Sequence, residues 1–199
     1  EEHVDANTVE ADIVSLRLVE LLAEDHFLLS PSTLLGIHRH LFTDVFPEEI
    51  PVGKFRKVNI TKKAPVLDGD TVQYSSHFMI QDALAYDFER EQNFSYASLT
   101  NEQKTLHAMT FLADIWQVHP FREGNTRTVA VFGIQYLRKL GFHIDNSLFS
   151  EHAAYFRNAL VLYHYQGEKQ DKQFLKMFFE NLLMGKKNIL SDEEMYAKK

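Results

Sequence analysis

Residues 119–127 read His-Pro-Phe-Arg-Glu-Gly-Asn-Thr-Arg and bring a base, a carboxylate, an amide and a guanidinium close together. The imidazole of His119 titrates near neutral pH and can take a proton from an attacking hydroxyl. The carboxylate of Glu123 suits Mg²⁺, which usually binds one or two carboxylates together with phosphate oxygens. Because the hydroxyl would come from the substrate, this chemistry needs no serine or cysteine nucleophile from the chain.

The second half of this motif predicts an anion site. Gly124 lets the backbone approach a phosphate closely, in a conformation that a Cβ would forbid. Asn125 can fix the loop or donate to a phosphate oxygen, and Arg127 offers a planar pair of donors where charge develops. The amides at the start of the following helix add to its dipole. A phosphate group is therefore the expected guest.

Apolar residues at helical spacing predict the elements that position the motif. Pro120 disfavours α conformation at His119, so a helix over 99–116 should end there and a second helix, 125–140, should open after the loop. The second helix is apolar on nearly every side, which indicates burial on all faces. Other helices are expected at 14–22, 31–42, 78–88, 149–165 and 174–183. Between them, residues 51–74 alternate around an Asp-Gly-Asp turn at 68–70, which predicts a β-hairpin.

Composition narrows the class of protein. The chain has 199 residues, 45% of them hydrophobic, with no linker-like segment, so one domain is expected. A formal charge of -7 argues against a broad nucleic-acid face and leaves room for a local basic pocket, for which Arg122, Arg127 and Arg138 are candidates. No apolar run is long enough to span a bilayer, and no secretory signal precedes the first helix. The absence of cysteine fits a cytoplasmic protein.

The motif resembles the signature of the Fic-domain family, His-Pro-Phe-any-Asp/Glu-Gly-Asn-Gly-Arg followed three residues later by a second arginine. The resemblance extends over about residues 30–185, because the helix at 31–42, the hairpin and the helix entering His119 come in the expected order. It implies a mainly α-helical bundle with a small β-hairpin flap. The expected domain plan is an N-terminal helical segment at 1–29, the Fic domain at 30–185 and a frayed, charged C-terminal tail at 186–199.

The resemblance also implies a reaction: transfer of AMP from ATP to a Tyr, Thr or Ser hydroxyl of a target protein. His119 would be the general base, and Glu123 would bind magnesium. The nucleotide would be bound by the rest of the motif: Phe121, Gly124, Asn125, Thr126 and Arg127. The hairpin would be a flap that pairs with a strand of the target, with the docking residues Lys63, Val66, Thr71, Val72 and Tyr74.

Two positions depart from the family pattern. Thr126 stands where glycine is usual and restricts the backbone, and Ala130 stands where the second arginine is usual, a residue linked to the γ-phosphate and to restraint of the activity. Many members also carry an inhibitory helix with Ser or Thr, three residues, Glu, then Gly or Asn. Neither Thr8 nor Ser191 begins a clean copy, so an inhibitory segment is expected upstream, on an antitoxin-like second chain, or nowhere.

Other readings stay open beside AMP transfer. The transferred group could be UMP, GMP, phosphocholine or phosphate, although the kinase-like branch of the family tends to have Ala and Lys at positions 124 and 126. The chain could also be a silent nucleotide-binding module that docks a partner. The expected partner is a target protein, with no nucleic acid and no membrane, and a homodimer is left open.

Two groups of residues outside the motif have competing readings. Tyr155 and Phe156 could stack on adenine, but aromatic residues at helical spacing favour the core. The basic residues of the hairpin region favour a solvated strand over a site for an acidic partner. They are Lys54, Arg56, Lys57, Lys62 and Lys63.

Overall fold

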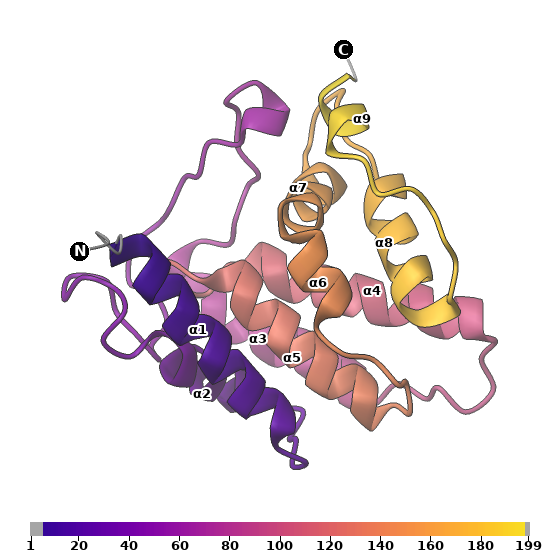
Figure 1. The fold of residues 1–199 in the computed structure, drawn as a ribbon, viewed down its shortest axis with the longest axis horizontal. Coiled ribbons are helices and arrows are strands. Elements are labelled where there is room, and N and C mark those ends of the chain that lie inside the picture. The colour runs from indigo at the N-terminus through magenta and orange to yellow at the C-terminus, as the bar shows by residue number, and fades with distance from the viewer. Residues whose placement is uncertain (1–5, 198–199) are drawn as a thin grey trace, which may run out of the picture.

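Helix α5 (Asn125–Lys139) runs through the middle of the computed structural model, which describes residues 6–197 (Figure 1). Every residue from Thr128 to Leu137 is buried, as its apolar pattern predicted. Helices α1 (Ala6–Ala23), α2 (Pro31–Phe42) and α4 (Asn101–Val118) pack against it. The motif therefore stands at the first turn of a helix that its neighbours hold on several sides.

The ends of these helices follow local sequence signals. Helix α2 has Pro31 at its first position and the Ser30 hydroxyl accepts from the Ser32 amide, while α4 begins with a capping box of Thr100 and Gln103. Helix α4 ends at His119, whose φ of 52° and ψ of 60° are left-handed and not extended. The chain thus leaves α4 abruptly and enters the motif loop.

Several of the remaining helices pack against α4 (Figure 1). Helix α3 (Ile80–Gln92) follows the 3₁₀ turn η2 (His77–Met79) and packs on α4. The helix expected at 149–165 is two helices, α6 (Ser147–Glu151) and α7 (Ala153–His164), because the backbone breaks at His152. Helix α8 (Gln173–Met184) packs on both α4 and α7. No helix in residues 6–197 has both the length and the apolar character needed to cross a membrane.

The C-terminal segment is more ordered than expected. Helix α9 (Asp192–Ala197) forms where a frayed tail was predicted, and it packs on α7. The side chain of Met195 is fully buried in the core. A single apolar residue among acidic ones is a weak sequence signal, which explains why the helix was missed.

The predicted β-hairpin is not found as paired strands within residues 6–197. Residues 62–74, the pocket loop, contain one isolated antiparallel bridge, Lys63 with Thr71, and a 3₁₀ turn η1 (Pro65–Leu67) at the tip (Figure 1). The Ala64 amide donates to the Asp70 carbonyl at 2.9 Å, so the loop does turn back on itself. Pro65 has no amide hydrogen, and Val66 is buried beside α7, which leaves too few residues for a ladder.

Candidate active site

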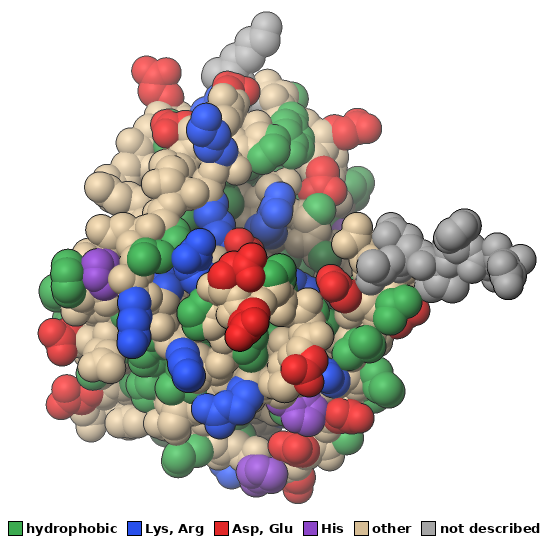
Figure 2. Space-filling view, turned by 90° about the vertical axis from the view of Figure 1, so that its left-hand side faces the viewer, with side chains coloured by type: hydrophobic (Ala, Val, Ile, Leu, Met, Phe, Trp, Pro, Cys, Tyr) green, Lys and Arg blue, Asp and Glu red, His purple; other side chains and the backbone are tan. Residues whose placement is uncertain are grey.

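A cleft of about 480 Å³ opens in front of the first turn of α5. Its walls come from the pocket loop, the end of α4, the motif loop and α7. The lining residues are Lys62, Lys63, Ala64, Tyr74, Trp116, His119, Glu123, Gly124, Asn125, Thr126, Arg127, Ala153, Ala154, Arg157, Asn158 and Val161. They include four basic side chains and one carboxylate, and Lys and Arg side chains gather near the centre of the face seen in Figure 2. An acidic chain therefore has a locally basic pocket that suits an anion.

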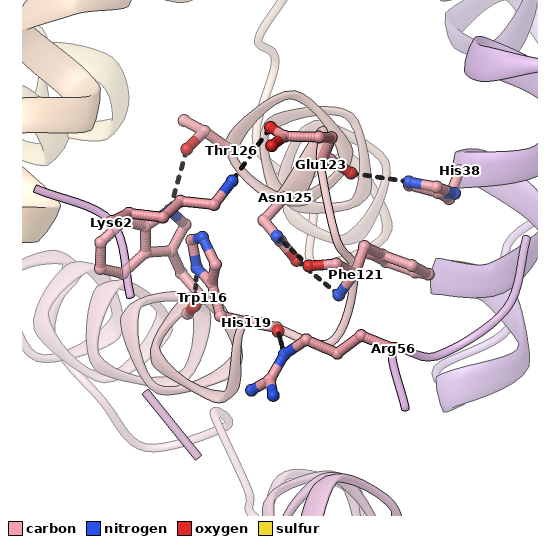
Figure 3. A network of polar contacts seen from close by, with 9 residues as sticks. All are labelled: His38, Arg56, Lys62, Trp116, His119, Phe121, Glu123, Asn125 and Thr126. Atoms are coloured by element: carbon pink, nitrogen blue, oxygen red, sulfur yellow. Dashed lines mark hydrogen bonds and ion pairs between the residues drawn. The ribbon is translucent and has the colours of Figure 1, made fainter. Parts of the chain in front are cut away.

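His119 is held in one tautomer at the floor of this cleft. Its Nδ1 lies 2.9 Å from the Trp116 carbonyl, which can only accept, so Nδ1 carries the proton (Figure 3). Tyr74 stacks on the imidazole with ring centroids 3.9 Å apart. Within residues 6–197, Nε2 has no hydrogen-bond partner, and it is the free lone pair of the ring. The side chain can thus accept a proton from a group in the pocket.

The electrostatic setting keeps His119 neutral. Burial, together with the nearby charges of Lys62 and Arg56, lowers the pKa of His119 to about 3, although the bond to Trp116 opposes the shift. The expectation that this ring titrates near neutral pH is therefore wrong for this structure. An anion in the pocket would counter these cations and raise its basicity.

Glu123 offers the pocket its carboxylate. The side chain is about half exposed, and Oε2 lies 3.0 Å from the Lys62 ammonium (Figure 3). No cluster of three or more metal-ligating side chains occurs among the described residues. One carboxylate beside an anion site still fits Mg²⁺, because phosphate oxygens and water complete its coordination. The position of Lys62 supports this fit, since a cation already sits beside the carboxylate.

The turn before α5 requires Gly124. Its φ is 80°, and an added Cβ would lie 2.4 Å from Cε2 of Phe42. Asn125 then closes the loop, because its Oδ1 accepts from the Phe121 amide at 2.9 Å and its Nδ2 donates to the Phe121 carbonyl at 2.8 Å. Asn125 therefore fixes the loop, which is one of the two roles predicted for it.

The first turn of α5 presents its backbone amides to the cleft. These amides have no acceptor within the helix, and no side chain caps them. Arg127, at the third helical position, lies over the Phe42 ring, with its guanidinium carbon 4.6 Å from the centroid. Amides, helix dipole and guanidinium therefore lie together at the cleft, in an arrangement that suits an anion.

Thr126 fits its place without strain. It is the second residue of α5 and is not among the residues with positive φ, so the expected restriction has no cost here. Its hydroxyl accepts from the Trp116 indole N–H at 2.9 Å. The hydroxyl proton is left for another acceptor. Ala130, the second departure, is buried on α5 and does not line the cleft.

Several predicted site residues do not line the pocket. Phe121 is buried and stacks on His38 at 3.9 Å, so its side chain supports the loop and does not face the cleft. Of the predicted docking residues, Lys63 and Tyr74 line the cleft. Val66 and Val72 are buried, and Thr71 lies at the base of the loop tip.

Three further expectations from the sequence have clear outcomes. Tyr155 and Phe156 are core residues, as the helical spacing favoured. Arg122 is exposed and does not line the cleft. Arg138 lies in the last turn of α5, donates to the Leu22 and Ile144 carbonyls, and lines a separate hollow.

Two buried residues outside the motif support it. His38 accepts from the Gly53 amide at Nδ1, so its Nε2–H donates to the Glu123 carbonyl at 2.8 Å (Figure 3). Burial and nearby Arg127 lower the pKa of His38 to about 4. Arg56 is 2% exposed and donates to the His119 carbonyl at 2.7 Å and to the Val118 carbonyl at 3.2 Å.

The reading of Arg56 as part of a solvated strand is therefore wrong. Its guanidinium also donates to the carbonyls of Val58 and Ser75, so it ties the segments on both sides of the pocket loop to the end of α4. Nothing in the local sequence separates this arginine from the exposed lysines on either side. His38 has a better signal, since it lies on the same face of α2 as the buried Leu34 and Leu41.

Comparisons with known proteins agree with this geometry. A model of the Fic/DOC family matches residues 28–137. Protein adenylyltransferase VbhT of Bartonella schoenbuchensis is 31% identical over 112 residues, which cover 55% of this chain and 21% of VbhT. Probable protein adenylyltransferase y4lH of Sinorhizobium fredii is 30% identical over 122 residues, which cover 56% of this chain and 54% of y4lH. The chain thus matches only part of the length of these curated relatives.

Solved structures share the fold at lower identity. The N-terminal Fic domain of Bep8 from Bartonella sp. 1-1C superposes with a TM-score of 0.67 at 19% identity, over 99% of this chain and 91% of that one. BepC of Bartonella tribocorum with bound AMPPNP gives a TM-score of 0.69 at 19% identity, over 89% and 85%. At these identities the likeness establishes the fold alone.

Proposed function

Since the chain belongs to the Fic/DOC family, we propose that it is a protein adenylyltransferase, which transfers AMP from ATP to a Tyr, Thr or Ser hydroxyl of a target protein. Relatives at about 30% identity are named as adenylyltransferases, and a neighbouring structure binds AMPPNP. The observation that carries the proposal is the position of His119, which is neutral and has a free Nε2 at the cleft. The first turn of α5, with its uncapped amides, lines the same cleft.

In the proposed reaction the target oxygen attacks the α-phosphorus of ATP. A new P–O bond forms to the target, the bond between the α-phosphorus and the bridging oxygen breaks, and pyrophosphate leaves. The hydroxyl proton passes to Nε2 of His119, while the Nδ1–H bond to Trp116 keeps the ring oriented. The amides at the start of α5 and the Arg127 guanidinium stabilise the charge that develops on the phosphate oxygens.

Glu123 would hold the magnesium ion that accompanies ATP. When bound, the ion neutralises phosphate charge and orients the leaving group. Lys62 lies beside the same carboxylate at 3.0 Å, so it would have to release Glu123 and can then contact a phosphate oxygen as a cation. The His38 bond to the Glu123 carbonyl fixes the backbone from which the carboxylate extends.

The target would approach along the pocket loop. Lys63 and Tyr74 line the cleft, and Tyr74 also stacks on His119, so a segment entering beside this loop would meet the catalytic base. Lys63 is exposed, and the loop has one bridge and no second strand on its outer side among the described residues. Pairing of a target strand with this edge is part of the proposal.

Mass spectrometry of the protein after incubation with Mg²⁺ and ATP tests the proposal, with and without candidate target proteins. We expect an adduct of AMP on a hydroxyl side chain of the target or of the chain itself. His119→Ala, which keeps the anion site and removes the base, is the matched control and should form no adduct. An adduct of phosphate alone, or equal adduct with His119→Ala, would contradict the proposal.

A further inference from the structure

Asn158, on the α7 wall of the cleft, is a buried amide with no hydrogen-bond partner among residues 6–197. Its side chain is 4% exposed and lines the cleft. The hydrogen bonds of the described residues include none from its Nδ2 or to its Oδ1. An amide carries two N–H donors and one carbonyl acceptor, and burying these without partners is costly. The amide is therefore placed to meet something that enters the cleft.

The amide also remains accessible from the cleft. Thr128 Oγ1 is the one fully enclosed side-chain polar atom without a partner in the described part of the chain. The nitrogen and oxygen of Asn158 are thus not sealed inside the protein. Because the rest of the residue is packed within α7, the amide has little freedom to turn elsewhere.

The surroundings of Asn158 differ from those of the phosphate end. The anion site consists of the first turn of α5, Arg127 and Lys62. Beside Asn158, α7 contributes the small apolar side chains Ala153, Ala154 and Val161 and one cation, Arg157. A phosphate oxygen can only accept, so it would leave the Asn158 carbonyl facing negative charge. The edge of a nucleotide base presents a donor beside an acceptor and satisfies both halves of the amide.

Arg157, next to Asn158, supports the same assignment. It is exposed and lines the cleft together with Tyr74. Burial raises the pKa of the Tyr74 hydroxyl to about 12, and the charge of Arg157 opposes that shift. A planar guanidinium can stack on an aromatic ring. The α7 wall therefore offers a flat cation for the face of a base and an amide for its edge.

We infer that Asn158 is a specificity-determining residue that reads the edge of the nucleotide base through paired hydrogen bonds. The inference rests on the proposed function, because it takes the ligand to be a nucleotide. Adenine satisfies an asparagine amide with its amino group and adjacent ring nitrogen. A carboxylate in the same place presents acceptors only and matches guanine, whose edge carries adjacent N–H donors.

Calorimetric titration separates the base from the phosphates. The full chain with Mg²⁺ is titrated with ATP, GTP and inorganic triphosphate, for the unmodified sequence, Asn158→Leu and Asn158→Asp. We expect Asn158→Leu to weaken ATP binding roughly tenfold and to leave triphosphate binding unchanged, in line with the discrimination of a paired base contact. Asn158→Asp, nearly the same shape, should reverse the preference toward GTP. Asn181→Leu on α8 breaks a bond to Asn188 away from the cleft and controls for general destabilisation.

The alternatives give different results. Equal losses for ATP and triphosphate would place Asn158 at the phosphates or in the packing, and equal losses for ATP and GTP would place it at the ribose; either result overturns the inference. Unchanged ATP affinity in both variants would mean that the amide holds water only, and also overturns it. If the unmodified chain binds inorganic triphosphate at least as tightly as ATP and GTP, it does not recognise a nucleotide. That result would contradict the proposed function itself, and the inference about Asn158 with it.

Discussion

Acidification should destabilise this protein because three histidines are held neutral by the fold. Burial lowers the pKa of His38 to about 4, of His119 to about 3 and of His164 to about 4. Protonation of His38 would remove the acceptor of the Gly53 amide. His119 and His164 donate to the Trp116 and Ala113 carbonyls, so protonation keeps those bonds and costs free energy because it buries a charge. In the unfolded chain each ring regains a pKa near 6.5.

The direction follows from proton uptake. Between pH 6.5 and 4 the unfolded chain binds protons at these rings and the folded chain does not, so the free energy of unfolding falls as the pH falls. From pH 7.5 to 5.5 each ring contributes a loss of about 1.4 kcal/mol, or about 4 kcal/mol for three. Asp87 offsets part of this loss. Burial and the charge of Asp114 raise its pKa to about 6, so as the pH falls the folded chain binds a proton there before the unfolded chain does, which favours the folded state.

The net loss is therefore about 3 kcal/mol, a large part of the stability of a typical domain. Urea unfolding at pH 7.5 and 5.5 measures it. His164→Gln keeps a donor for the Ala113 carbonyl and should shrink the difference between the two pH values by about 1.4 kcal/mol. The same change at His26, whose side chain is 89% exposed, serves as the control and should leave the difference unchanged. A difference below about 1 kcal/mol for the unmodified chain would mean that the three histidines do not stay neutral in the folded state.

Three substitutions test other parts of the structure. Gly124→Ala places a Cβ 2.4 Å from the Phe42 ring at a φ of 80°. It should lower the free energy of unfolding in urea by about 2 kcal/mol or more and weaken ATP binding. Unchanged stability would contradict the left-handed conformation and close packing of Gly124. Arg56→Leu leaves buried carbonyls at the end of α4 unpaired and should cost about 3 kcal/mol, whereas Lys57→Leu at the exposed neighbour should have little effect. Thr128→Val removes a buried hydroxyl without a partner and should raise stability by about 1 kcal/mol, and a fall in melting temperature would show that the hydroxyl is satisfied.

Much of the fold could be predicted because its signals are local. The apolar period of α5 and Pro31 at the start of α2 follow from neighbouring residues, and both are found where expected. The capping box at Thr100 is a further local signal, at the start of α4. The family resemblance, which the family match confirms, supplied the order of the elements. The predicted hairpin was wrong in detail, since alternation over a short segment does not reveal that Val66 and Val72 are buried and leave one bridge.

The site was predictable only where it is contiguous. The motif gave His119, Glu123 and the turn at Gly124, because these residues are close in sequence. Arg56, His38 and Asn158 come from three other segments, and their roles depend on burial and on which carbonyl or cleft they reach. No local pattern encodes those distances. The pKa of His119 also escaped prediction, because it depends on burial by the surrounding elements.

Transfer of label from ATP to protein distinguishes AMP transfer from phosphate transfer. The chain is incubated with Mg²⁺, a target protein and ATP labelled at either the α-phosphate or the γ-phosphate, beside His119→Ala. We expect label to reach protein from the α-position only, transfer to depend on His119, and chelation of the metal to abolish it. Label arriving only from the γ-position, or transfer that survives in His119→Ala, would contradict AMP transfer with His119 as its base.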